Sequence, residues 1–116
     1  MKTLDDRVLL HLEDGRRVPV EPDEVFFLEA EEGNTLVRTR SAERLTDVRQ
    51  LSVLLPQFED HGFFEIHRGW AVNLRKVREI RPTDDGGWQL RLDPPVNRVL
   101  PVSRRRVGEL WERFGG

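Results

Sequence analysis

The sequence predicts a mostly β fold built from several short antiparallel strands and two short helices. Short stretches alternate apolar and polar residues, as residues 88–92 do, and this is the spacing of a strand with one buried face. Turn-forming clusters separate these stretches, among them residues 13–15 and 84–87, which are rich in Asp and Gly. Only two segments show the wider apolar spacing of a helix.

The expected strands follow the turn signals along the chain. They cover residues 7–11, 16–20, 25–30, 35–39, 63–67, 70–72, 77–81, 88–92 and 96–102. Residues 31–34 join two of these strands, and Gly33-Asn34 suits a backbone with positive φ.

Two helices are predicted from caps and apolar spacing. The first is expected from Asp47 to Leu55, with Thr46 as its N-cap and Pro56 ending it. Its apolar side would consist of Val48, Leu51, Val53, Leu54 and Leu55. The second helix is expected after Ser103, a good N-cap residue. Val107, Leu110, Trp111 and Phe114 recur there near helical spacing.

Length and composition favour a single domain over residues 1–116, with its core at about residues 7–114. The chain has 116 residues, of which 37% are hydrophobic, which is enough for a modest core. There is no cysteine, so disulfides, a thiol nucleophile and Cys-based metal sites are excluded, and the cytoplasm is the expected compartment. The start, Met1 to Asp6, lacks the apolar core of a signal peptide, and no apolar run approaches the ~20 residues of a membrane span.

Charge is distributed unevenly along the chain. The net charge is −2, but residues 1–60 carry 8 Lys/Arg and 14 Asp/Glu, whereas residues 61–116 carry 11 and 7. The halves therefore have net charges of 8 − 14 = −6 and 11 − 7 = +4. A local basic face can attract a polyanion despite an acidic back, because fields are screened beyond roughly 8 Å at physiological salt. The alternative is a solvated surface of mixed charge.

Two basic segments are candidate sites for binding a polyanion. Arg68 interrupts an apolar run between Ile66 and Trp70, so it is expected at a tight corner between two strands, where Gly69 permits an unusual backbone turn. Arg104, Arg105 and Arg106 stand at the expected start of the last helix, where cations oppose the helix dipole. Such a local conflict is typical of a functional site. The alternatives are an ordinary surface arginine and a tolerated charge run.

Other polar residues are assigned structural roles. His67 should point inward as a structural histidine, and Asn73 at a strand end should stabilise a turn. The three histidines lack metal-ligand spacing, so no metal site is expected. No catalytic constellation or phosphate-binding glycine loop is present, so we predict no enzymatic activity and no cofactor. Trp70, Trp88 and Trp111 are assigned to the core.

Several ordered segments resemble the LytTR DNA-binding domain, the output module of many bacterial response regulators. They are residues 63–73, 77–80 and 100–105, with 25–34 upstream, and the resemblance covers roughly residues 7–114. It implies an elongated, mostly β fold of packed small sheets. It also implies a sequence-specific, double-stranded DNA-binding transcriptional regulator domain whose loops enter successive major grooves of a direct-repeat site.

The resemblance also implies which residues contact DNA. Asn34, Arg68 and Arg105 match the family's base-contacting positions, with Arg104 beside the third. Arg75, Lys76 and Arg104 are expected mainly on phosphates. This chain departs from the family at Gly69, where Ser is usual, and at Glu31-Glu32, whose acidity should weaken the contact made by Asn34.

The implied partners are double-stranded DNA and a signalling partner domain. Two copies per site are expected, from a chain that is a monomer or weak dimer in solution, and no membrane partner is expected. A receiver or sensor domain upstream, as in two-component systems, is not part of this sequence. The alternative function is a small β protein-interaction or ligand-sensing module without DNA binding. RNA binding is less well supported, because the aromatic residues look buried and tyrosine is missing.

Overall fold

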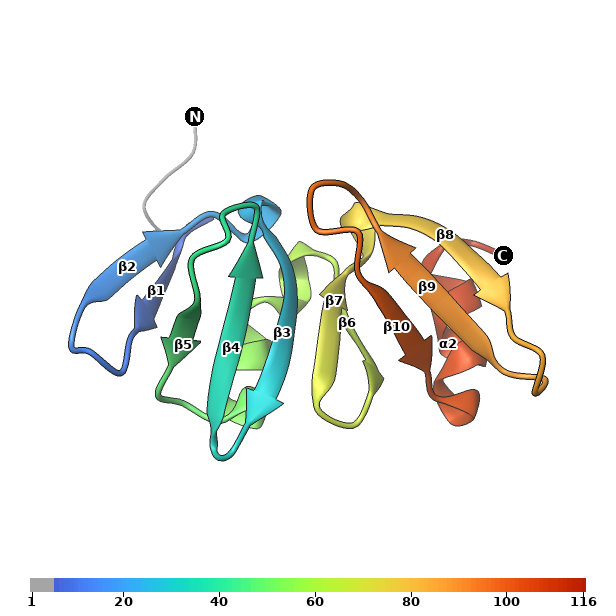
Figure 1. Cartoon of the computed structure of the whole chain (residues 1–116), viewed down its shortest axis with the longest axis horizontal. Coiled ribbons are helices and arrows are strands. Elements are labelled where there is room, and N and C mark those ends of the chain that lie inside the picture. The colour runs from blue at the N-terminus through green and yellow to red at the C-terminus, as the bar shows by residue number, and fades with distance from the viewer. Residues whose placement is uncertain (1–5) are drawn as a thin grey trace.

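The structure is a computed structural model in which residues 6–116 are described. Residues 1–5, which belong to the start expected to lack a signal peptide, lie outside the described residues. Three antiparallel sheets lie side by side along the longest axis, and two helices pack behind them (Figure 1). The molecule measures 43 × 36 × 25 Å. The predicted mostly β fold class is confirmed.

Ten strands and two α-helices make up the regular structure of residues 6–116. The strands are β1 (Val8–His11), β2 (Arg17–Val20), β3 (Val25–Glu31), β4 (Asn34–Thr39), β5 (Leu45–Asp47), β6 (Phe63–His67), β7 (Trp70–Asn73), β8 (Val77–Pro82), β9 (Trp88–Leu92) and β10 (Val99–Val102). The helices are α1 (Leu51–Leu54) and α2 (Val107–Arg113). Short 3₁₀ turns are η2 (Pro22–Glu24), η3 (Leu55–Gln57), η4 (Glu59–His61), η5 (Leu74–Lys76) and η6 (Arg104–Arg106).

The central sheet has five strands in the order β5-β4-β3-β7-β6. A hairpin of β1 and β2 lies at one end of the molecule, and a three-stranded sheet, β10-β9-β8, lies at the other (Figure 1). All pairings among the described strands are antiparallel.

Strand β3 separates two hydrophobic cores. Val25 and Leu28 pack into a core with β1, β2 and α1, whereas Phe26 and Phe27 pack into a core with the three-stranded sheet and α2. All four side chains are at most 1% exposed. A strand that is covered on both faces has a continuous apolar run instead of alternation, which explains the sequence from residue 25 to 28.

The sequence-based prediction placed the start of the first helix too early. Asp47 and Thr46 belong to β5, which pairs with β4, and α1 starts only at Leu51. Val48 and Val53, assigned to the apolar side of that helix, are 48% and 55% exposed. The segment with apolar residues near helical spacing therefore consists of the end of a strand, a connector and a single helical turn.

Two further boundaries differ from the prediction near the C-terminus. The last strand begins at Val99, because Asn97 adopts a positive φ of 51° and the backbone turns there. Ser103 precedes η6 but forms no side-chain capping bond, and α2 begins after the three arginines. The three tryptophans are half-buried, and Phe114 is 50% exposed. None of the helices within residues 6–116 has the length and apolar character needed to cross a bilayer.

Candidate nucleic-acid interface

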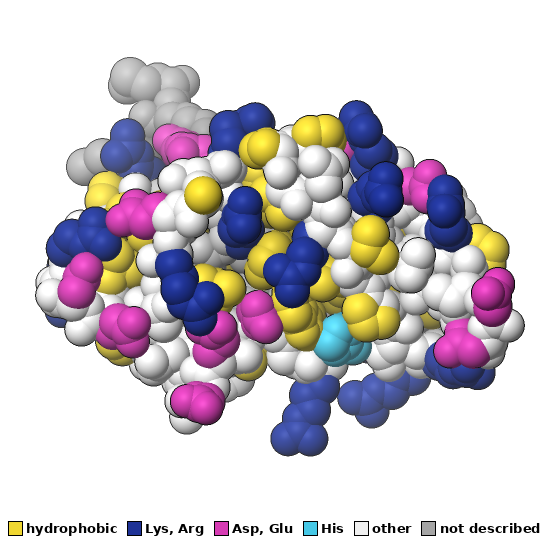
Figure 2. Space-filling view, in the orientation of Figure 1, with side chains coloured by type: hydrophobic (Ala, Val, Ile, Leu, Met, Phe, Trp, Pro, Cys, Tyr) yellow, Lys and Arg dark blue, Asp and Glu magenta, His cyan; other side chains and the backbone are white. Residues whose placement is uncertain are grey.

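Three turns lie along one edge of the molecule, which we call the three-turn edge. They are the β3–β4 turn (residues 31–34), the β6–β7 turn (residues 67–70) and η6. Strands β3, β6 and β10 run in the same direction and end at this edge, the lower edge of Figure 1. Basic side chains project past the same edge in Figure 2. Segments distant in sequence therefore present their turns in one row.

Main-chain hydrogen bonds connect the three turns. The N–H of Ala30, on β3, donates to the carbonyl of Gly69 at 2.8 Å. The N–H of Ser103, at the end of β10, donates to the carbonyl of Ile66 on β6 at 2.8 Å. Because both bonds involve the β6–β7 segment, that segment sets the positions of the turns on either side of it.

Arg68 occupies the tip of the β6–β7 turn. Gly69 has a φ of +89°, a conformation that strains other residues, while a Cβ there would make only an ordinary contact with Ala30 at 3.7 Å. Glycine is therefore required by the backbone angle and not by lack of space. Arg68 is exposed, and its guanidinium has no hydrogen bond or ion pair within residues 6–116.

His67 is half-buried beside Arg68. Its Nδ1 lies 2.9 Å from the Arg68 carbonyl oxygen, and its ring centroid is 6.1 Å from that of Trp70. The contact links the histidine ring to the backbone of the turn. His67 therefore faces the turn and one neighbouring ring, and it is not enclosed in either core.

Asn34 and Arg68 line one groove of about 450 Å³ between the β3–β4 and β6–β7 turns. Asn34 is the first residue of β4 and is half-buried. The positive φ angles of this hairpin occur at Glu32 (47°) and Gly33 (88°), and not at Asn34 as the sequence suggested. The two-residue turn of Glu32 and Gly33 thus leaves Asn34 in extended backbone, facing its neighbours across the hairpin.

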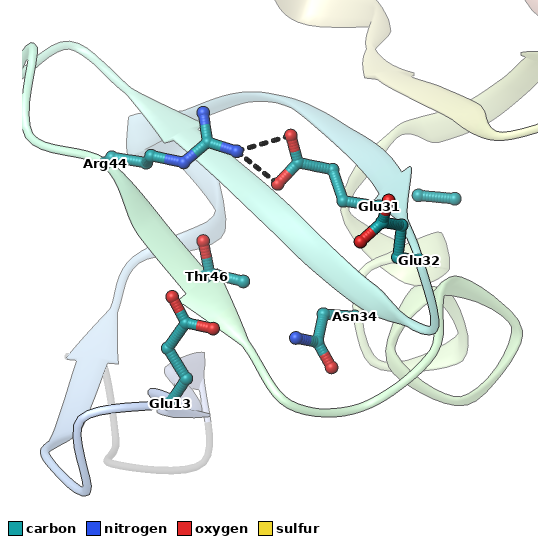
Figure 3. Close-up of a pocket in the computed structure, with 7 residues that line it drawn as sticks. Glu13, Glu31, Glu32, Asn34, Arg44 and Thr46 are labelled. Atoms are coloured by element: carbon teal, nitrogen blue, oxygen red, sulfur yellow. Dashed lines mark hydrogen bonds and ion pairs between the residues drawn. The ribbon is translucent and has the colours of Figure 1, made fainter.

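An acidic hollow adjoins Asn34 on its other side (Figure 3). Glu13, Glu31 and Glu32 surround it, and the Arg44 guanidinium donates to both oxygens of Glu31 at 2.5 Å. Arg44 offsets one of these charges, whereas Glu32 has no recorded cationic partner within the described chain. A phosphate approaching Asn34 would meet this remaining negative charge.

The three consecutive arginines of η6 make different contacts. Arg104 donates from Nη2 to the Asp85 carbonyl in the β8–β9 turn at 2.9 Å. Arg106 donates from Nε to the Glu65 carbonyl at 2.8 Å and lies 4.5 Å from the centroid of the Phe64 ring. Arg105 is exposed and has no polar partner within residues 6–116. Sequence reasoning grouped Arg104 with Arg105 and did not single out Arg106.

Arg75 and Lys76 are not brought to the three-turn edge. They lie in η5, after β7, at the opposite end of that strand from Arg68. Lys76 is half-buried with its Nζ 5.2 Å from the centroid of the Phe26 ring, and Arg75 forms an ion pair with Asp23 at 3.7 Å. The structure therefore separates these two cations, which were expected mainly on phosphates, from Arg68 and Arg105.

Asn73 holds the start of η5. It is fully buried, its Oδ1 accepts from the Arg75 N–H at 3.0 Å, and its Nδ2 donates to the Val25 carbonyl at 3.0 Å. A longer bond of 3.4 Å reaches the Pro22 carbonyl. The side chain thus connects the end of β7 to the start of β3.

Arg98 is a second cation that the sequence analysis did not identify. Its guanidinium lies 5.2 Å from the ring centroid of Trp70 and 5.6 Å from that of Phe27. The side chain is exposed, and it connects the segment before β10 to rings on β3 and β7 of the central sheet. No sequence signal distinguishes it from other surface arginines, because the rings are more than 20 residues away in the chain.

The side chains of the three-turn edge can bind a ligand through guanidinium and amide groups. Within residues 6–116, no cluster of His, Asp and Glu side chains has an arrangement that could hold a metal ion. Exposed guanidinium groups at turns donate to phosphate oxygens or to guanine edges, and Asn can pair with a base edge. A mostly β chain that presents such groups from its turns has the chemistry of a nucleic-acid-binding module.

The family model of the LytTr DNA-binding domain matches residues 15–115, and the chain belongs to this family. The resemblance found in the sequence is confirmed. A solved LytTr DNA-binding domain from Bacillus cereus has the same fold, with a TM-score of 0.77, 23% sequence identity, and coverage of 96% of this chain and 98% of that one.

Curated relatives are regulatory proteins that are longer than this chain. The transcriptional regulatory protein YpdB of Escherichia coli (strain K12) is 32% identical over 101 residues, which cover 86% of this chain and 41% of YpdB. The sensory transduction protein LytT of Oceanobacillus iheyensis is 26% identical over 112 residues, which cover 96% of this chain and 45% of LytT. The chain thus spans less than half the length of each relative.

Proposed function

We propose that this chain is a sequence-specific, double-stranded DNA-binding domain of a transcriptional regulator, and that the three-turn edge contacts the DNA. The observation that carries this proposal is a pair of exposed guanidinium groups, those of Arg68 and Arg105, which have no partner within residues 6–116 and lie on turns that share one edge. Membership of the family and the similarity to the transcriptional regulatory protein YpdB support a role in transcription. The proposed role is binding without catalysis, in the cytoplasm.

The dimensions of the molecule suit a site that spans two grooves. Its longest extent is 43 Å, and successive major grooves on one side of B-DNA are about 34 Å apart. In this arrangement Arg68 and Arg105 contact guanine edges or adjacent phosphates, and Asn34 contacts a base edge or a phosphate. Residues 6–116 act as one domain, because β3 contributes side chains to both cores.

We further propose a direct-repeat site that binds two copies of the chain, with a receiver or sensor domain joined to it in a longer protein. The copies would bind as monomers or a weak dimer. The two half-sites of a direct repeat have the same orientation along the duplex. Each copy would therefore contact its half-site with the same edge and in the same orientation.

Selection from a random duplex library tests the proposal. We expect enrichment of a repeated motif and tight binding to it, with affinity that falls steeply as salt is raised, because each neutralised phosphate releases counterions. A scrambled duplex of the same composition is the control. Failure to retain any duplex even at low salt would contradict the proposal and favour a protein-interaction or ligand-sensing module.

A further inference from the structure

The three arginines of η6 cannot all face one DNA duplex. A 3₁₀ turn has about three residues per turn, so successive side chains diverge by about 120° around its axis. The contacts follow this geometry: Arg104 reaches the β8–β9 turn, Arg106 reaches β6, and Arg105 lies between them without a polar partner in the described chain.

Arg106 is held on the side of the central sheet. Besides its bond to the Glu65 carbonyl, its Nη1 forms an ion pair with Glu109 at 3.0 Å, and its side chain is only 28% exposed. The guanidinium also stacks against Phe64, a ring in the core beneath it. All these contacts oppose an outward swing of Arg106 toward a ligand.

Arg104 is held on the side of the three-stranded sheet. Its acceptor, the Asp85 carbonyl, belongs to a turn that has its own bonds: Thr83 Oγ1 donates to the Asp85 carboxylate, and the Gly87 N–H donates to it at 3.1 Å. These bonds lower the pKa of the Asp85 carboxyl, the Thr83 hydroxyl contributing most. Arg104 therefore binds a turn that already has a defined conformation.

We propose that Arg104 and Arg106 are positioning residues that brace η6 from its two sides, and that Arg105 is the one arginine of the three that contacts DNA. This inference rests on the proposed function, and it departs from the sequence-based expectation that Arg104 contacts a phosphate. The braces hold the Arg105 backbone beside the β6–β7 turn, so that Arg105 and Arg68 meet the duplex at a set spacing.

The salt dependence of binding separates a positioning residue from a phosphate contact. Each phosphate neutralised by the protein contributes about 0.9 to the slope of log affinity against log salt. We expect Arg105→Gln to weaken DNA binding roughly 10- to 100-fold. If Arg105 contacts a phosphate, the substitution should also lower this slope by about 0.9. If Arg105 contacts a guanine, the substitution should instead relax the preference at one base pair.

Arg104→Gln and Arg106→Gln should behave differently from Arg105→Gln. We expect each to lose roughly three- to tenfold in affinity, the equivalent of one hydrogen bond, with the slope of the wild-type chain. A decrease of the slope by more than half of 0.9 in either variant would show a direct phosphate contact and overturn the inference for that residue. Arg104 is exposed, so Arg104→Gln leaves the fold intact even if Arg106→Gln does not.

A double-mutant cycle gives an independent test. If the braces act only through Arg105, then Arg104→Gln should have little effect on affinity in a chain that already carries Arg105→Gln. Additive losses would overturn the inference. A wild-type chain that binds no duplex would overturn the proposed function and this inference together, whereas additive losses in a chain that binds DNA would overturn only the inference.

Discussion

The main-chain N–H of Ser103 donates to the carbonyl of Ile66 across 2.8 Å and so attaches the end of β10 to the end of β6. Both residues directly precede segments that carry an arginine without a partner in the described part of the chain: η6 follows Ser103, and the β6–β7 turn follows Ile66. The relative placement of Arg68 and Arg105 therefore depends on backbone pairing, and the predictions below use that placement.

Arg68→Ala is expected to weaken binding to the selected site by about 1–3 kcal/mol and to relax the preference at one base pair, because arginine makes two parallel bonds to guanine. Titration against the selected duplex and its single-base-pair variants measures both effects. Equal losses on specific and scrambled DNA would instead identify a phosphate contact.

Lys76→Ala is the matched control for Arg68→Ala. Both changes remove one cation, but Lys76 lies at the opposite end of β7, beside Phe26. We therefore expect unchanged affinity and an unchanged salt slope. A shallower slope would show that DNA passes over η5, as the sequence alone had suggested.

Glu32→Gln should tighten DNA binding by roughly 1.5- to fivefold, because exposed charge interactions are worth about 0.2–1 kcal/mol. The substitution removes a negative charge beside Asn34 and keeps the size of the side chain. The gain should shrink as salt is raised, since the repulsion is screened. Glu43→Gln, on an exposed carboxylate outside the hollow around Asn34, is the control and should have a smaller effect.

Asp47→Asn should lower the free energy of unfolding by roughly 3 kcal/mol at neutral pH, because it leaves Arg49 without its charged partner. Burial by itself raises the pKa of Asp47, but hydrogen bonds from the Arg49 side chain and from the N–H groups of His11 and Arg49 outweigh it, so the net pKa lies below the ordinary value. Urea denaturation of both proteins measures the difference.

The pH dependence of the Asp47 effect follows from the direction of its pKa shift. A carboxyl whose pKa is lowered by folding stabilises the folded chain above its unfolded pKa of about 3.9, and this contribution is lost as the pH falls through the folded pKa. The difference between wild type and Asp47→Asn should therefore shrink below about pH 4. A difference that is constant down to acid denaturation would contradict the role of the ionised carboxylate.

Asn73→Ala should lower the free energy of unfolding by about 1–3 kcal/mol, because it leaves the buried Val25 carbonyl and the Arg75 N–H without partners. Asn73→Asp retains an acceptor for Arg75 and loses the donor to Val25, so it separates the two bonds. If Asn73→Ala were as stable as the wild type in thermal unfolding, water would have to satisfy both groups.

The sequence predicted the strands best where short turns and local alternation define them. Residues 88–92 are an example, since β9 has the predicted bounds. The first helix was misplaced because the local sequence favours a helix at Asp47 and does not show the long-range partners of this residue. Its hydrogen bond to the His11 N–H and the pairing of β5 with β4 decide in favour of a strand. Local propensity yields to such tertiary contacts.

The candidate site was predicted residue by residue but not as a surface. Arg68 stands out in the sequence because it interrupts an apolar run, whereas the family resemblance distinguishes Arg105 from the arginines beside it. The direction of one strand, β7, places Arg75 and Lys76 at the end opposite Arg68. Arg104 and Arg106 are anchored by carbonyls that lie 19 and 41 residues away in the chain. The sequence alone does not show which distant carbonyl accepts a hydrogen bond from a given arginine.

The attachment of the three turns through main-chain N–H and carbonyl groups has a consequence for how such domains diversify. Any residue except proline supplies the donor, and every residue supplies the acceptor. Substitutions of side chains at the tips therefore leave these main-chain bonds in place. On the proposed function, a single change at a tip could alter the preferred duplex without a matching repair elsewhere in the chain.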